Sequence, residues 1–211
     1  YAVTICLIFA LLAQIASNFG NDYFDYKKGS DNADRVGPRR AVASGDISPQ
    51  SMLLATILTL ALACATGCLL IPIGGWKLLI ARIFIAIFAI AYSAGPYPLS
   101  YHGLGDIAVF IFFGLIAVNL SFYVQSLYFD RQVFLCSIAM GLLSVNILMV
   151  NNYRDKETDE ISNKKTLVVL FGRKFAEYAY LLNGIAALAV TGTIWFMTSI
   201  PGYIAAILYL S

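Results

Sequence analysis

The sequence predicts an all-α protein, a multi-pass bundle of transmembrane helices. Of its 211 residues, 60% are hydrophobic and only 12% are charged, whereas about a quarter of the residues in soluble domains are charged. Several apolar runs reach the roughly 20 residues that a helix needs to cross the hydrocarbon core of a membrane. Polar stretches separate these runs. We therefore expect an integral membrane protein whose main partner is the lipid bilayer.

The predicted membrane segments follow one another along the whole chain. They cover residues 1–20, 51–73, 77–94, 106–128, 132–153 and 174–197, and another begins after Pro201. The long polar stretches between them are 21–50 and 154–173, and a shorter one is 93–105. Because apolar runs reach both ends of the sequence, we expect 1–211 to be one transmembrane domain that is truncated at both ends.

The distribution of charge predicts how these segments cross the membrane. Four segments separate the polar stretch at 21–50 from the one at 154–173, so both stretches return to the same face. Eleven of the 14 Lys and Arg residues lie on this face, and the positive-inside rule makes it cytoplasmic. The net charge of +2 is too small to indicate a nucleic acid as partner. The eleven are Lys27, Lys28, Arg35, Arg39, Arg40, Arg154, Lys156, Lys164, Lys165, Arg173 and Lys174.

Two of these polar stretches carry amide and carboxylate side chains at helical spacing. Members of each row are three or four residues apart, so on a continuing helix they share one face. Each row begins at the end of an apolar segment, and we expect it to face a water-filled cavity inside the bundle. The first row is Asn18, Asp22 and Asp25, with Asn21 beside them, and the second row is Asn151, Asp155 and Asp159.

The two acidic rows predict a divalent cation and a phosphate ligand. Facing carboxylates repel one another unless a cation lies between them, and oxygen-only ligands suit Mg²⁺, which completes its coordination shell with water and phosphate. Basic residues are interleaved with the rows, and Arg and Lys bind phosphate oxygens. Together the metal ligands and the cations indicate a diphosphate. The predicted diphosphate-binding residues are Lys28, Arg35, Arg39, Arg40 and Arg154.

Other interpretations of these residues stay open at this point. Charged residues outside membrane helices are often solvated loops that set orientation, and intramembrane carboxylates also mark ion pathways, as in a cation transporter. The position of the rows at one interface, among as many cations, argues against a transporter. Asp106 in "GLGD" is expected to cap the N-terminus of its helix. His102, the only histidine, is expected to be a surface or packing residue.

The longest motifs resemble a known family of membrane enzymes. The stretches "NDYFDYKKGSDNADRVGPRRAVASGDIS" and "NNYRDKETDEISNKKTLVVLFGRKFA" resemble the two aspartate-rich motifs of the UbiA superfamily of intramembrane prenyltransferases. The segments "DRVGPRRAVASG", "AGPYPLSYHGLGD" and "FFG" are most similar to the branch that prenylates 1,4-dihydroxy-2-naphthoate in menaquinone synthesis. The resemblance covers almost the whole chain and implies nine transmembrane helices around a central cavity, of which about seven are present here.

The resemblance also implies roles for individual residues. It assigns Mg²⁺ binding to Asn18, Asn21, Asp22, Asp25, Asn151, Asp155 and Asp159, whose four aspartates would be the catalytic residues. It assigns the diphosphate of a polyprenyl diphosphate to Lys28, Arg35, Arg40 and Arg154, with Arg39 beside them. The implied reaction transfers the polyprenyl group to 1,4-dihydroxy-2-naphthoate with loss of carbon dioxide, in a bacterial inner membrane with the site facing the cytoplasm.

One departure and one rival accompany this resemblance. Gly29 occupies a position where many relatives have a further aspartate, so a metal contact from the following Asp31 is not implied. The rival is another aromatic acceptor, such as 4-hydroxybenzoate or homogentisate, because the motifs do not identify the residues that contact the ring.

Overall fold

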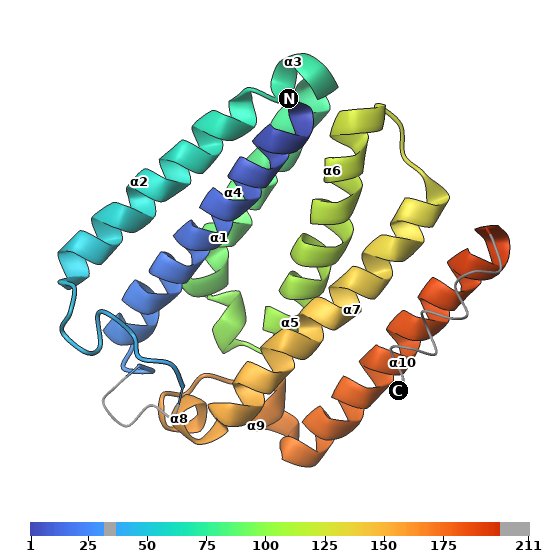
Figure 1. Cartoon of the computed structure of the whole chain (residues 1–211). Coiled ribbons are helices and arrows are strands. Elements are labelled where there is room, and N and C mark those ends of the chain that lie inside the picture. Colours follow the sequence, from blue (N-terminus) through green and yellow to red (C-terminus); the bar gives the residue numbers. More distant parts are fainter. Residues whose placement is uncertain (32–36, 199–211) are drawn as a thin grey trace.

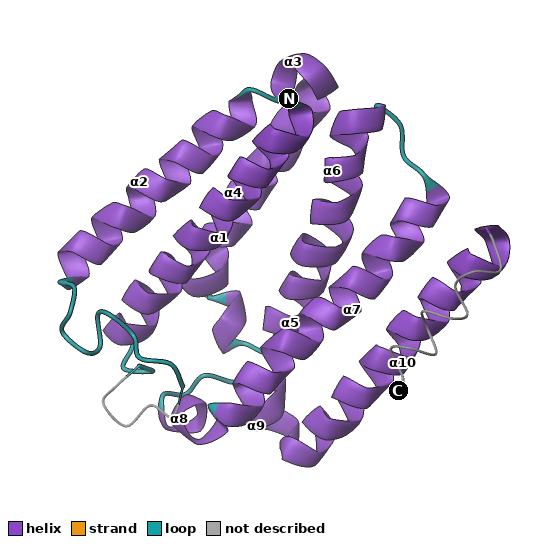
Figure 2. Cartoon of the chain, in the orientation of Figure 1, coloured by secondary structure: helices purple, strands orange, loops and turns teal. Residues whose placement is uncertain are grey.

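The computed structural model describes residues 1–31 and 37–198, which form a bundle of long helices (Figure 1). Two predictions, Arg35 and the segment after Pro201, lie outside these residues. The prediction of an all-α fold is confirmed (Figure 2). The long helices are α1 (Ala2–Lys27), α2 (Pro49–Cys68), α4 (Trp76–Ser93), α7 (Arg131–Arg154), α10 (Arg173–Thr198) and a continuous stretch of α5 (Gly105–Val109), the π-helical η2 (Phe110–Ile116) and α6 (Ala117–Ser126).

Several of these helices match the thickness of a membrane. Within the described part of the chain, α1, α2, α7 and the stretch Gly105–Ser126 are long and apolar enough to span a bilayer. Many large apolar side chains on these helices are exposed, as lipid-facing residues must be. The predicted segment at 1–20 is longer in the structure, because the acidic row continues α1 to Lys27.

Short elements connect the long helices at the two ends of the bundle. Figure 1 shows α3 and the α6–α7 turn at one end, whereas the α1–α2 loop, α8, α9 and the α4–α5 connection lie at the other. The polar stretches therefore lie at one end, as the sequence predicts. The short elements are α3 (Ile71–Gly74), η1 (Leu99–Tyr101), α8 (Lys156–Ile161) and α9 (Leu167–Phe171).

Side-chain caps fix where several helices begin. Ser48 accepts a hydrogen bond from the amide of Ser51 at 3.2 Å, and Pro49 then opens α2. Asp130 begins α7 by accepting from the amides of Gln132 and Val133 at 2.7 and 3.1 Å. These contacts satisfy amide groups that the first helical turn leaves without an internal partner.

Two glycines allow η2 and α7 to touch through their backbones. A Cβ atom on Gly114 would lie 2.5 Å from the Cα of Gly141 and 2.6 Å from the carbonyl oxygen of Ser137. A Cβ atom on Gly141 would in turn lie 2.9 Å from the carbonyl oxygen of Phe110. Small residues at helix contacts permit such close approach in membranes. This contact holds the middle of the bundle together.

A polar contact joins α10 to α7 inside the membrane region. The Asn146 amide donates to the carbonyl oxygen of Tyr180 at 3.0 Å, and its oxygen accepts from Asn183 at 3.1 Å. Next to this contact, an apolar cluster of Val145, Met149, Val168 and Ala176 packs α7, α9 and α10 together. The loop that carries the second acidic row is therefore anchored on both sides.

Gly114→Ala is expected to destabilise the protein, because the added methyl group meets backbone atoms that cannot move aside. We expect a loss of roughly 1–3 kcal/mol, measured as a lower apparent melting temperature in detergent. Gly184→Ala is the matched control, since nothing lies within 4 Å of a Cβ atom at that helical position. Equal melting temperatures for the two variants would contradict the close contact.

Candidate active site

A polar cavity of about 290 Å³ lies at the end of the bundle where the polar stretches meet. Side chains from α1, α4, α7, α8 and the loops between them line it. Asn18, Asn21 and Asp25 of the first row and Asn151, Asp155 and Asp159 of the second row all contribute. The structure thus brings the two rows to one cavity although more than 100 residues separate them in sequence. Arg39, Arg40, Arg154 and Lys164 are also among its lining residues.

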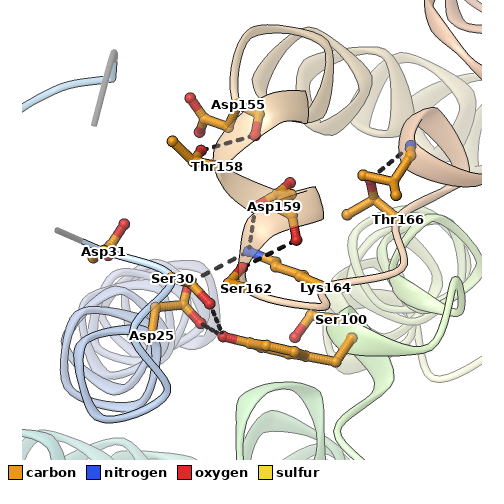
Figure 3. A network of polar contacts seen from close by, with 12 residues as sticks. Asp25, Ser30, Asp31, Ser100, Asp155, Thr158, Asp159, Ser162, Lys164 and Thr166 are labelled. Carbon is orange, nitrogen blue, oxygen red and sulfur yellow. Dashed lines mark hydrogen bonds and ion pairs between the residues drawn. The ribbon is translucent and has the colours of Figure 1, made fainter. Parts of the chain in front are cut away.

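Lys164 lies between the two rows. Its Nζ is 3.5 Å from Oδ2 of Asp25 and 3.6 Å from Oδ1 of Asp159, as Figure 3 shows. Burial would lower the pKa of Lys164, but the carboxylates of Asp25 and Asp159 outweigh burial, and the pKa is raised. An ammonium group therefore compensates the facing carboxylates in this structure.

The Asp159 carboxyl group lies outside the membrane spans and has a perturbed pKa. Burial raises its pKa to about 6, the Lys164 ammonium opposes this rise, and the charges of Asp155 and Asp25 add to it. Its Oδ2 atom is buried without a hydrogen-bond partner among the described residues. Asp159 thus offers one oxygen to the cavity that the described protein atoms do not use.

A network of hydroxyl groups fixes the position of Asp25. The Tyr101 hydroxyl donates to Oδ1 of Asp25 at 3.0 Å and lies 2.5 Å from the Ser30 hydroxyl. Burial and the neighbouring Asp25 raise the pKa of Tyr101, which keeps the phenol protonated as a donor. Gly29 makes this arrangement possible because its φ of 76° ends α1 and turns Ser30 back toward Asp25.

The remaining acidic residues have contacts of two different kinds. Arg154 binds Asp155 through two parallel hydrogen bonds of 2.6 and 2.7 Å. Asp22 instead accepts hydrogen bonds from the amides of Ala41 and Val42 at 3.1 and 3.3 Å, and it is not among the cavity residues. In this structure, Asp22 anchors the α1–α2 loop against the end of α1.

The predicted phosphate-binding residues are distributed unevenly. Arg40 lies 3.4 Å from Asp31, whereas Arg39, which also lines the cavity, pairs with the exposed Asp46 at 2.6 Å. Lys28 donates to the carbonyl oxygen of Ser93 at 2.8 Å and lies over the ring of Tyr101, outside the cavity lining. Arg154 and Arg40 therefore have the clearest positions for an anionic ligand in the cavity.

The donor atoms in the cavity fit a magnesium ion. The lining carries carboxylate and amide oxygens and no sulfur, and the unpaired Oδ2 of Asp159 adds a buried oxygen. No cluster of three or more His, Cys, Asp and Glu residues close enough to hold a metal occurs within the described ranges. The amide oxygens of Asn18, Asn21 and Asn151 would therefore have to supplement the carboxylates.

Sequence reasoning missed Lys164 and Tyr101. A run of two lysines gave no reason to prefer Lys164, but the preceding Asn163 has a φ of 56°, which turns the chain at the end of α8. The amide of Lys164 then donates to the carbonyl oxygen of Asp159 at 2.8 Å. An asparagine that ends a helix in this conformation is a recognisable signal, and it would have directed attention to the next residue.

Two predictions about single residues have different outcomes. The prediction that Asp106 caps its helix is wrong: α5 begins after Leu104 with no side-chain cap, and Asp106 is buried in the cavity lining. The backbone turn at Gly103 and Leu104 already starts the helix, so the carboxylate is not needed there. The prediction for His102 as a packing residue is confirmed, because its ring stacks on Tyr97 and contacts the carbonyl oxygen of Pro98.

Comparison with protein families identifies the chain. A model of the UbiA prenyltransferase family matches residues 2–211. The chain belongs to the UbiA prenyltransferase family. Family membership and the four apolar helices make this UbiA family member an integral membrane protein. UbiA prenyltransferases are in general metal-dependent, which agrees with the oxygen-rich cavity.

Named relatives of this UbiA family chain share one description. Proteins of Haemophilus influenzae, Escherichia coli and Bacillus subtilis, each called 1,4-dihydroxy-2-naphthoate octaprenyltransferase, are 39%, 41% and 30% identical to it. The matches cover 88%, 85% and 88% of this chain. The chain spans 63%, 61% and 62% of the lengths of these relatives. No solved structure matches the chain.

Lys164→Met is expected to destabilise the metal-free protein, because Asp25 and Asp159 lose the cation between them. With chelator present at pH 8, we expect the apparent melting temperature to fall by roughly 5–10 °C. The deficit should shrink at pH 5, below the Asp159 pKa of about 6, because protonated Asp159 no longer repels Asp25. Lys165→Met is the matched control, since Lys165 is exposed, and a deficit of the same size in both variants would refute the bridging role.

Proposed function

We propose that this chain is the catalytic domain of a membrane prenyltransferase that acts on 1,4-dihydroxy-2-naphthoate. The donor is a polyprenyl diphosphate, and the product after loss of carbon dioxide is the reduced, quinol form of demethylmenaquinone. The observation that carries the proposal is the convergence of both acidic rows on one cavity at a single end of the bundle. The names of the relatives support naphthoate as the acceptor.

The two rows would hold Mg²⁺. The proposed ligands are Asn18, Asn21, Asp25, Asn151, Asp155 and Asp159 in the cavity, with Asp22 behind them as a further candidate. Magnesium, when bound, supplies positive charge that stabilises a departing diphosphate. The proposed catalytic aspartates are those whose charges would position that metal, namely Asp22, Asp25, Asp155 and Asp159.

The basic residues would bind the diphosphate directly. Arg40 and Arg154 line the cavity, and a guanidinium group can donate two parallel hydrogen bonds to phosphate oxygens. Both side chains now pair with acidic neighbours, which keeps them in place before a ligand arrives. Lys28 and Arg39 are proposed to contribute further positive charge to diphosphate binding, and Arg35, which lies outside the described residues, stays a proposed diphosphate-binding residue from the sequence.

The cavity walls would favour transfer to an aromatic ring over reaction with water. As the bond between the allylic carbon and the diphosphate oxygen breaks, Arg40 and Arg154 stabilise the charge that develops on the leaving group. The electron-rich ring carbon of the acceptor then bonds to the allylic carbon. The membrane position of the bundle keeps the prenyl chain in lipid and limits the access of water to the allylic cation.

We infer a bacterial inner membrane with the site facing the cytoplasm. Of the eleven basic residues that the sequence assigns to this face, the ten within the described ranges lie at or near the end of the bundle that holds the cavity. The positive-inside rule supports a cytoplasmic location for that end. Cysteine labelling of an exposed loop residue, such as Ser44→Cys, from each side of inverted vesicles tests this orientation.

A cation transporter is less compatible with the arrangement of the cavity. Lys164, Arg154 and Arg40 all line it, and they would oppose the passage of a metal ion. A different aromatic acceptor is the nearer competitor, since the acidic rows would act on the donor in either case. A comparison of reaction rates with different aromatic acceptors is therefore needed to identify the acceptor.

Asp155→Ala and Asp159→Ala in the full-length protein are expected to lower prenyl transfer by about 100-fold or more, because each removes a proposed ligand of the Mg²⁺ whose positive charge would stabilise the leaving diphosphate. Glu160→Ala is the matched control, since this neighbouring carboxylate is exposed and pairs with Lys156 at 3.4 Å. Product formation from radiolabelled prenyl diphosphate measures the rates. Wild-type rates in the aspartate variants would remove the proposed role of the second row.

Chelation of Mg²⁺ is expected to stop turnover of 1,4-dihydroxy-2-naphthoate, and added Mg²⁺ is expected to restore it. The same assay with 4-hydroxybenzoate and homogentisate identifies the acceptor by comparison of kcat/KM. A larger kcat/KM for either competitor would overturn the choice of naphthoate, and turnover in excess chelator would overturn the metal requirement.

A further inference from the structure

Asp106 is a buried carboxylate in the cavity whose role the donor chemistry does not explain. It is only 6% exposed, and it contributes to the lining beside the acidic rows. Its Oδ1 atom is buried and has no hydrogen-bond partner among the described residues. A buried polar atom without a partner is costly. An oxygen in this situation therefore indicates a ligand that supplies the missing donor.

The charges around Asp106 indicate what kind of donor that is. The cavity cations Lys164 and Arg154 pair with the acidic rows, and Arg40 pairs with Asp31. Within residues 1–31 and 37–198, none of the recorded ion pairs involves Asp106. A carboxylate outside the cation network would repel a diphosphate. The fitting partner is therefore an uncharged donor such as a hydroxyl group.

The residues beside Asp106 in the cavity lining are uncharged. Gly105 has no side chain, and a Cβ atom there would lie 3.5 Å from the Tyr92 hydroxyl oxygen and 3.7 Å from Cδ2 of Leu148. Ser100 completes this part of the lining and is held by a hydrogen bond of 2.7 Å to the carbonyl oxygen of Tyr92. These neighbours of Asp106 are a phenol, an aliphatic side chain and a hydroxyl group, with no cation among them, and they suit a hydroxylated aromatic ring better than a phosphate.

We propose that Asp106 is a catalytic residue that accepts the proton of the acceptor's ring hydroxyl. This inference rests on the prenyl-transfer function and adds the group that activates the acceptor. The first row, the second row and the arginines act on the diphosphate, whereas Asp106 acts on the ring. The cavity thus has a donor side and an acceptor side.

The protons and electron pairs of this step move only between the two substrates and Asp106. The hydroxyl O–H bond beside the carboxylated ring carbon breaks, and its proton passes to Oδ1 of Asp106. The freed electron pair moves through the ring to form the bond to the allylic carbon, while the diphosphate leaves with the electron pair of its C–O bond. The bond between the ring carbon and its carboxylate then breaks, and carbon dioxide leaves. The electron pair of this bond stays with the ring, which regains aromaticity. Asp106 returns the proton to the ring oxygen.

Asp106→Asn tests this role in the full-length enzyme, because the amide keeps the shape but cannot take the proton. We expect kcat for the acceptor to fall about 100-fold, as for loss of a general base, and KM for the prenyl diphosphate to stay within about twofold of wild type. Asp130→Asn is the matched control. It removes a charge at the opposite end of the bundle, where asparagine can still cap α7.

Inhibitor binding gives a second measurement that needs no turnover. The probes are 1-hydroxy-2-naphthoate and 1-methoxy-2-naphthoate, in which a methyl group replaces the hydrogen that the hydroxyl group would donate. Wild type and Asp130→Asn are expected to bind the hydroxy compound at least about tenfold more tightly. Asp106→Asn is expected to bind the two compounds within about threefold of each other.

The outcomes separate this inference from the proposed function. The role of Asp106 is overturned if Asp106→Asn still binds the hydroxy compound more tightly than the methoxy compound. It is also overturned if the variant has the kcat of wild type. Loss of affinity for prenyl diphosphate in the same variant also overturns it, because Asp106 would then support the site as a whole. If wild type binds no prenyl diphosphate, the proposed function fails, and the hydroxy–methoxy comparison still decides the contact with Asp106.

Discussion

The structure depends on the compensation of acidic charge at the end of a membrane bundle. Asp25 and Asp159 come from opposite parts of the chain, and each is nearly inaccessible to solvent. Two such carboxylates repel one another strongly where the local dielectric constant is low. The Lys164 ammonium between them offsets this repulsion and fixes the distance between α1 and α8. The shape of the cavity follows from this bridge, because the helices that carry its walls end there.

Hydrogen bonds connect the loops around the Lys164 bridge to one another. Tyr101 contacts Asp25 through its hydroxyl, and its backbone carbonyl accepts from the amide of Lys165 at 3.1 Å. Asp22 holds the α1–α2 loop in the same region through backbone amides. Hydrogen bonds therefore connect each polar stretch to at least one other. These bonds hold the wall of the cavity in place without a large apolar core beneath it.

The sequence could predict most of the fold, because hydrophobic length and helical spacing are local properties. The six long helical stretches, four of which are long and apolar enough to span a bilayer, could be predicted in this way. So could the common end of the polar stretches and the meeting of the two rows. The role of Lys164 could not be predicted from the sequence, because it depends on a turn at Asn163 and on a partner, Asp25, that lies 139 residues away. Asp106 was misread for a related reason: "GLGD" has the composition of a helix cap, and only the three-dimensional cavity shows where the carboxylate lies.

The long separation between Asp25 and Lys164 has a consequence for biogenesis. Membrane helices enter the bilayer in the order of synthesis, so α1 is inserted well before the ribosome reaches residue 164. During that interval Asp25 lies at the interface without its ammonium partner, and the water there has to stabilise its charge. Closure of the polar end is thus a late event that requires α7 and α8 to be in place. The cavity therefore acquires its bridged form only after Lys164 has been synthesised.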